Sequence, residues 1–170
     1  MKSVLISIQP KWCDLIASGK KTIEVRKTRP SIDTPFKCYI YETKGLYKGS
    51  GGCLFNGRGK VIGEFACDDI KMSFVGYDEK GCPSYWDILD GSCLTPNELV
   101  CYGEWKTLYG WHISDLVIYD KPKELSEFYR HDTTYDNTFG WAFEDRAKKT
   151  PITRPPQSWC YIEHTDEKGR

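Results

Sequence analysis

Six short apolar runs, containing β-branched and aromatic residues and with little helical pattern between them, most constrain the fold of this 170-residue chain. They are "SVLISIQ" at 3–9, "KTIEVRK" at 21–27, "KCYIYE" at 37–42, "KVIGEFAC" at 60–67, "HISDLVIYD" at 112–120 and "SWCYIE" at 158–163. Runs of this length and composition are typical of strands. Parallel α/β architecture needs a helix after nearly every strand, which this pattern does not supply. We therefore expect a mostly β, α+β fold built on a small β-barrel of about six strands, with a mixed α+β sheet as the alternative.

Two short helices are indicated between these runs. "PKWCDLIASG" at 10–19 has proline at the first helical position and ends at Gly19, and its apolar residues recur at helical spacing. "TPNELVCYG" at 95–103 carries a capping box, with Thr95 as the cap and Glu98 three residues later. The first helix lies between the first two expected strands and leads directly into the second.

The length fits one domain, which we place at 1–164 with a flexible tail at 165–170. We expect insertions near 43–58, 72–105 and 128–152. The first of these is glycine-rich and is expected to be a flexible loop.

Charge and hydropathy limit the choice of partner and compartment. Lysine plus arginine and aspartate plus glutamate number 24 each, so a surface for nucleic acid must come from local clustering rather than from a basic excess. The apolar runs are too short for a signal peptide or a membrane span. We expect a cytoplasmic, soluble protein with no membrane partner; the sequence does not specify its oligomeric state.

The eight cysteines include no CxxC pair, and the three histidines do not lie at zinc-like spacing from them. Several cysteines lie in apolar runs, where a thiol behaves as a small hydrophobe, so we expect them to be buried and reduced. We expect no metal and no cofactor. The absence of Walker, GxGxxG and GxSxG motifs argues against the usual nucleotide and serine hydrolases. His112 has no nucleophile at a known spacing and is interpreted as structural.

The stretch "SGKKTIEVRKTRP" at 18–30 concentrates five basic side chains around Glu24, a local charge of +4. Strand alternation places Lys21 on one face and both Glu24 and Arg26 on the other. A lysine partly removed from water can act as a base, a nucleophile or an anion clamp, and arginine suits bidentate contact with phosphate. We expect these residues to form a basic lip around a pocket, the alternative being an ordinary salt-bridged surface.

Gly19, Lys21, Glu24 and Arg26 spell G-x-K-x-x-E-x-R between the first helix and the second strand. This motif resembles the signature of ASCH domains, members of the PUA-like superfamily of β-barrels. Four longer blocks resemble bacterial and phage ASCH proteins in the same order: "VLISIQPKWCDLIASGKKTIEVRK", "KVIGEFACD", "YGWHISDLVIYDKPKEL" and "RPPQSWCYIE".

The resemblance implies binding of RNA or of a modified nucleoside. Some ASCH proteins instead remove the acetyl group from acetylated cytidine, using a lysine, a threonine and a glutamate, and another type is reported to cleave RNA. The lysine falls on Lys21, Glu24 stands where that type has threonine, and Glu64 is the best candidate for the glutamate. Binding is therefore preferred, with an amidohydrolase, a ribonuclease or a protein-interaction domain as alternatives.

The candidate catalytic residues are Lys21, Glu24 and Glu64. Tryptophan stacks well on bases, and Trp12 is favoured over Trp105, Trp111 and Trp159 because its helix leads into the motif. The expected ligand-binding residues are Gln9, Trp12, Gly19, Lys20, Lys21, Glu24 and Arg26.

Overall fold

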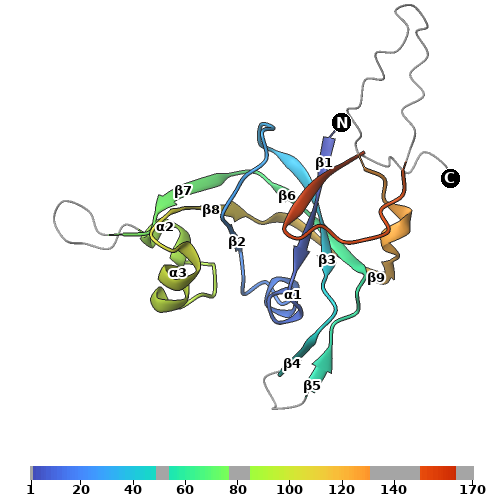
Figure 1. The fold of residues 1–170 in the computed structure, drawn as a ribbon, viewed down its shortest axis with the longest axis horizontal. Helices are drawn as coiled ribbons and strands as arrows, with labels where there is room; N and C mark the ends of the chain where they lie inside the picture. Colours follow the sequence, from blue (N-terminus) through green and yellow to red (C-terminus); the bar gives the residue numbers. More distant parts are fainter. Residues whose placement is uncertain (1, 49–53, 77–84, 131–149, 164–170) are drawn as a thin grey trace, which may run out of the picture.

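The computed structural model describes residues 2–48, 54–76, 85–130 and 150–163 (Figure 1). The elements in these residues are β1 (Lys2–Ile8), α1 (Pro10–Ala17), β2 (Ile23–Arg26), β3 (Phe36–Glu42), β4 (Leu46–Lys48), β5 (Leu54–Asn56), β6 (Val61–Cys67), β7 (Ile70–Phe74), α2 (Trp86–Leu89), α3 (Pro96–Gly103), β8 (Thr107–His112), β9 (Ser114–Lys123), a short 3-10 helix (Leu125–Glu127) and β10 (Trp159–Glu163). All six expected strands are present, as β1, β2, β3, β6, β9 and β10. Both expected helices are present as α1 and α3. The mostly β, α+β class is confirmed.

The strands of the described residues form three hydrogen-bonded sheets. A five-stranded sheet has the order β10-β1-β3-β6-β9, a three-stranded sheet the order β2-β8-β7, and β4 pairs with β5. β1 and β3 run parallel and the other pairs are antiparallel, so the large sheet is mixed. This hydrogen bonding does not close into a barrel, so the closed barrel stays a prediction.

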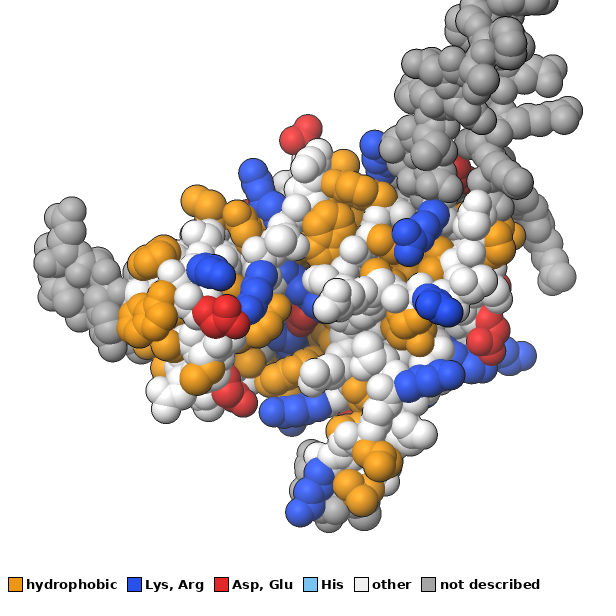
Figure 2. All heavy atoms as spheres, in the orientation of Figure 1, with side chains coloured by type: hydrophobic (Ala, Val, Ile, Leu, Met, Phe, Trp, Pro, Cys, Tyr) orange, Lys and Arg blue, Asp and Glu red, His pale blue; other side chains and the backbone are white. Residues whose placement is uncertain are grey.

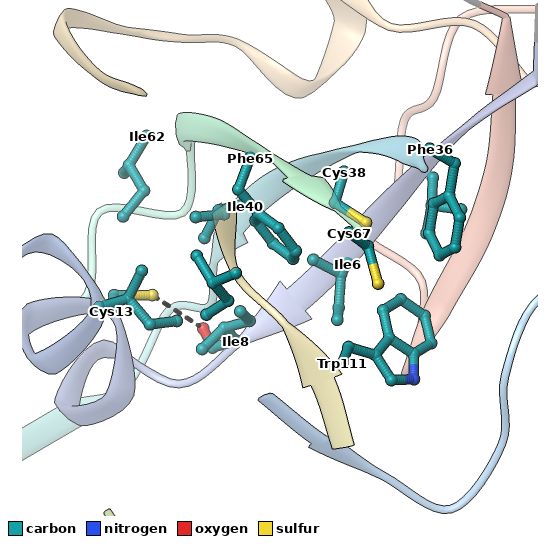
Figure 3. Close-up of a cluster of buried hydrophobic side chains, with 13 residues drawn as sticks. Ile6, Ile8, Cys13, Phe36, Cys38, Ile40, Ile62, Phe65, Cys67 and Trp111 are labelled. Atoms are coloured by element: carbon teal, nitrogen blue, oxygen red, sulfur yellow. Dashed lines mark hydrogen bonds between the residues drawn. The ribbon is translucent and has the colours of Figure 1, made fainter. Parts of the chain in front are cut away.

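The core that positions the site lies between the five-stranded sheet and β8 (Figure 3). Alternate residues of the sheet point toward it, including Ile6 of β1, Cys38 of β3 and Phe65 of β6. Trp111 of β8 is fully buried and packs edge-on against Phe36, with ring centroids 5.9 Å apart. Trp111 is therefore a core residue and not a stacking platform for a ligand.

The stretch expected to be a flexible loop contains the hairpin of β4 and β5, which projects from the body in Figure 1. Tyr47 of β4 donates a hydrogen bond of 2.5 Å to the carboxylate of Asp14, which ties the hairpin to α1. Such anchoring is a tertiary contact, and glycine-rich composition does not reveal it.

The other two expected insertions, 72–105 and 128–152, differ in how much of each the structure describes. The stretch 72–105 contains most of β7, which pairs along β8, together with α2 and α3, so part of it belongs to a sheet. Most of 128–152, and all of 165–170, lie outside the described residues. None of the helices in the described part of the chain has the length and apolar character that crossing a bilayer requires.

The cysteines of the described residues are free thiols. Cys13, Cys38 and Cys67 are buried, and burial raises the pKa of each, that of Cys67 to about 12. Cys93 and Cys101 are exposed, so the expectation that the cysteines are buried is wrong for these two.

Candidate functional site

A pocket of about 490 Å³ lies beside α1, where the start of β2 faces the segment that precedes β10. Basic side chains, with acidic atoms between them, are visible near the centre of the face in Figure 2. The residues that line the pocket are Ser7, Ile8, Gln9, Trp12, Lys21, Glu24, Val25, Arg26, Thr43, Leu94, Tyr102, Pro155, Pro156 and Gln157. Five of the expected site residues are among them: Gln9, Trp12, Lys21, Glu24 and Arg26.

A turn, and not a strand, brings Lys21 into this pocket. α1 ends at a turn in which Gly19 has a φ of +72°, a conformation that favours glycine, and β2 begins only at Ile23. The prediction from strand alternation, that Lys21 and Glu24 point in opposite directions, is therefore wrong. The same alternation correctly places Glu24 and Arg26 on one face, because both lie within β2.

These three side chains form a buried ion group. Each carboxylate oxygen of Glu24 forms an ion pair: Oε2 lies 3.3 Å from Lys21 Nζ, and Oε1 lies 3.0 Å from Arg26 Nη2. The three side chains are only 2%, 8% and 10% exposed for Lys21, Glu24 and Arg26. Two cations and one carboxylate leave a formal net charge of +1, so the pocket is electrostatically suited to a ligand that carries negative charge.

Backbone carbonyls hold the two cations in place. Lys21 Nζ donates a hydrogen bond of 2.7 Å to the carbonyl of Ser92, and Arg26 Nη2 donates one of 2.5 Å to the carbonyl of Ser7. Among the residues that the structure describes, the buried Nε of Arg26 has no hydrogen-bond partner. The guanidinium therefore keeps unused donor capacity in a site where unpaired donors are costly.

The aromatic wall of the pocket is Trp12 of α1. The ammonium of Lys21 lies 5.1 Å from its ring centroid and that of Lys11 lies 4.3 Å away. Contacts of this kind fix the ring relative to the buried charges. Gln9, which precedes α1, is exposed at the rim.

The lip of five cations expected from the sequence does not form as such. Of the five, only Lys21 and Arg26 line the pocket. Lys20, Lys27 and Arg29 are exposed, and Lys27 pairs with Glu104 at 2.9 Å. Gly19 and Lys20, both expected to bind the ligand, do not line the pocket.

The structure separates Glu64 from the pocket. Its neighbour Phe65 points into the core described above, so Glu64 points to the opposite face of the five-stranded sheet. There it accepts hydrogen bonds from Lys37 at 2.7 Å and Tyr119 at 2.5 Å. Burial alone raises the pKa of Glu64, but these hydrogen bonds, together with the positive charges of Lys37 and Lys123, outweigh it and the net pKa is lowered. Glu64 is thus held ionised on the far face of the sheet, where it forms a structural ion pair with Lys37.

Other lining residues were not identified from the sequence. Tyr102 comes from α3, and Pro155, Pro156 and Gln157 come from the segment before β10. The capping box of α3 was recognisable, but the face that α3 turns to the pocket depends on tertiary packing. The sequence shows two consecutive prolines, Pro155 and Pro156, but nothing in it indicates that they line a pocket.

His112, which was interpreted as structural, lies outside the pocket. Its Nδ1 is 2.6 Å from Asp68 Oδ1 in a half-exposed pair. Among the residues that the structure describes, no group of three or more His, Cys, Asp or Glu side chains is placed to hold a metal ion.

Comparison with known proteins establishes the family. The ASCH domain model matches residues 6–112, so the chain belongs to the ASCH domain family, whose PUA-like fold is associated with RNA binding. The fold is similar to the crystal structure of ASCH from Zymomonas mobilis, at a TM-score of 0.60 and 20% identity over 95% of this chain and 87% of that chain. A variant of that protein with tyrosine replaced by phenylalanine matches at a TM-score of 0.60 and 20% identity over 96% and 91% of the two chains. A search of curated proteins finds no match.

Proposed function

We propose that this protein binds RNA or a modified nucleoside in the pocket formed by Trp12, Lys21, Glu24 and Arg26. The observation that carries the proposal is the buried ion group of net charge +1 beside an aromatic wall. Membership of a family with an RNA-associated fold supports the same ligand class.

Each side chain has a role that suits a nucleotide. The indole of Trp12 stacks on a base, a contact that contributes about 1–3 kcal/mol in single-strand binders. Arg26 and Lys21 donate hydrogen bonds to phosphate or base oxygens, and Glu24 accepts a hydrogen bond from a base amino group. Because Ser7 and Ser92 already hold the two cations, little side-chain freedom is lost on binding.

The test is a titration of short single-stranded RNA and of nucleosides into the protein at several salt concentrations. We expect RNA affinity to fall steeply with salt, because bound phosphates release counterions. Trp12→Ala is expected to weaken binding by about 5- to 150-fold, the equivalent of one lost stacking contact. The matched control is Trp105→Ala, which removes an exposed tryptophan that does not line the pocket.

Absent or salt-insensitive RNA binding contradicts the RNA form of the proposal. If Trp12→Ala and Trp105→Ala weaken binding equally, the ligand does not bind in this pocket. Thermal melts of each variant show whether a loss of binding reflects a loss of folding.

The enzymatic alternatives have weaker support. Lys21 lines the pocket, as an amidohydrolase acting on acetylated cytidine requires, but Glu24 holds its ammonium and Glu64 lies on another face. Incubation with acetylated cytidine, and separately with RNA, tests both the amidohydrolase and the ribonuclease. Turnover that Lys21→Ala abolishes would favour an enzyme over a binding protein.

A further inference from the structure

A second hollow of about 390 Å³ adjoins the pocket. Its lining residues are Tyr41, Thr43, Lys44, Gly59, Leu125, Thr153 and Pro155. Thr43, which follows β3, and Pro155, which precedes β10, line both hollows. The two therefore share a partition built from two segments that are distant in sequence.

The chemistry of the second hollow differs from that of a packing defect. Hydroxyl groups of Tyr41, Thr43 and Thr153 supply donors and acceptors, and Lys44 supplies the charge, with no carboxylate among the described residues that line it. The Tyr41 phenol, whose ordinary pKa of 10.0 is raised further by burial, is protonated at neutral pH and can donate a hydrogen bond. Such a surface is suited to an anionic, hydroxyl-rich ligand.

Lys44 is held where it can serve that ligand. Its aliphatic stem lies against Gly59, where an added Cβ would come within 2.5 Å of Lys44 Cε, and Gly59 has a φ of +67°. Within the described part of the chain Lys44 has no carboxylate at ion-pairing distance. No described carboxylate therefore neutralises the charge of Lys44. Lys21 and Arg26 differ in this respect, because Glu24 neutralises part of their charge.

We propose that the two hollows form one groove for two consecutive nucleotides of single-stranded RNA, an inference that rests on the proposed function. One nucleotide occupies the pocket at Trp12, and the phosphodiester crosses the partition of Thr43 and Pro155. The neighbouring nucleotide lies beside Lys44. Both volumes fall in the range of about 300–1,000 Å³ that small-ligand sites occupy. The net charge of the pocket and that of Lys44 each match the single charge of one backbone phosphate.

The test measures dissociation constants for the four common nucleosides and for the dinucleotide built from each. For the nucleoside that binds best, we expect its dinucleotide to bind at least about tenfold tighter. We expect Lys44→Ala to remove most of that gain in affinity. It should leave the affinity for the nucleoside unchanged, because the nucleoside does not reach the second hollow. It should also reduce the salt dependence of dinucleotide affinity by the amount expected for the loss of about one phosphate contact. The matched control is Lys71→Ala, an exposed lysine of β7 that lines neither hollow.

A dinucleotide with a neutral methylphosphonate linkage separates charge from size, and we expect it to lose part of the gain. Equal affinity for nucleoside and dinucleotide, or no effect of Lys44→Ala on either, refutes the groove. If Trp12→Ala still weakens both ligands in that case, the proposed function stands without the groove. If none of these probes binds, the RNA form of the proposed function fails and the groove with it.

Discussion

Replacing Glu24 by glutamine isolates the energetic role of the buried ion group. The substitution keeps the shape of the side chain but removes the charge that lies 3.3 Å from Lys21 Nζ and 3.0 Å from Arg26 Nη2. Two buried cations then face one another without a carboxylate between them. Glu24→Gln is therefore expected to destabilise the protein without altering the packing of the core.

The magnitude follows from the burial of the group. Breaking a buried ion pair costs about 3–5 kcal/mol, and we expect the lower end here because the pocket opens to solvent on one side. For a chain of this length, a loss of about 3 kcal/mol lowers the melting midpoint by roughly 6–12 °C. Thermal unfolding followed by circular dichroism at low salt measures the shift.

Two comparisons make the result specific. Glu24→Gln combined with Lys21→Met removes one cation as well as the carboxylate, so the double variant is expected to be more stable than Glu24→Gln alone. Glu104→Gln, which removes an exposed partner of Lys27, is expected to leave the midpoint nearly unchanged. A Glu24→Gln midpoint within about 1 °C of wild type would refute the reasoning, since it would mean that the carboxylate does not compensate buried charge.

Three further changes test other parts of the structure. Glu64→Gln is expected to leave ligand binding unchanged and to cost less than about 1 kcal/mol at neutral pH, because the pair with Lys37 is partly exposed. Since folding lowers the pKa of Glu64, that stability is present above its ordinary value of 4.5 and is lost as the pH falls through the lowered value, so urea titrations of the two proteins should converge in acid. Gly63→Ala drives a Cβ into the carbonyl oxygen of Val117 and is expected to cost about 1–3 kcal/mol by urea denaturation; wild-type stability would contradict the register of β6 and β9. Thr95→Ala removes the cap of α3 and should cost about 1 kcal/mol, and an unchanged urea midpoint would argue against the capping box.

Features set by local interactions were predictable from the sequence. The capping box of α3 uses Thr95 and Glu98, which lie within one turn, and it forms as expected. α1 likewise begins at Pro10, whose missing N–H is no loss in the first turn. All six strand predictions were confirmed, because the β-branched and aromatic residues in these runs suit a half-buried pleated surface.

Features set by distant contacts were not predictable in the same way. Both Thr22 N and Ile23 N donate to the carbonyl of Gly91, and this contact delays the start of β2 until after Lys21. No pattern near Lys21 records that contact, so the alternation argument gave the wrong face. The same limit applies to Glu64, whose sheet face depends on where Phe65 packs.

The candidate site contains both residues that the sequence made predictable and residues that only distant contacts bring to it. Trp12, Lys21, Glu24 and Arg26 are close in sequence, and this proximity, the local cluster of basic residues and the resemblance to the ASCH motif together made a shared site a reasonable hypothesis. Tyr102 and the prolines before β10 reach the pocket only through the tertiary fold. The sequence thus indicated the chemistry of the pocket but not the walls that shape it.

Nuclear magnetic resonance during a titration with a short single-stranded RNA tests most directly whether the buried ion group receives the ligand. The indole N–H of Trp12 and the unpartnered Nε–H of Arg26 each give a distinct signal within the pocket. We predict that both signals shift saturably along one binding curve, while the indole signal of the exposed Trp105 stays in place. Saturable binding that leaves the Trp12 and Arg26 signals unmoved would contradict the account.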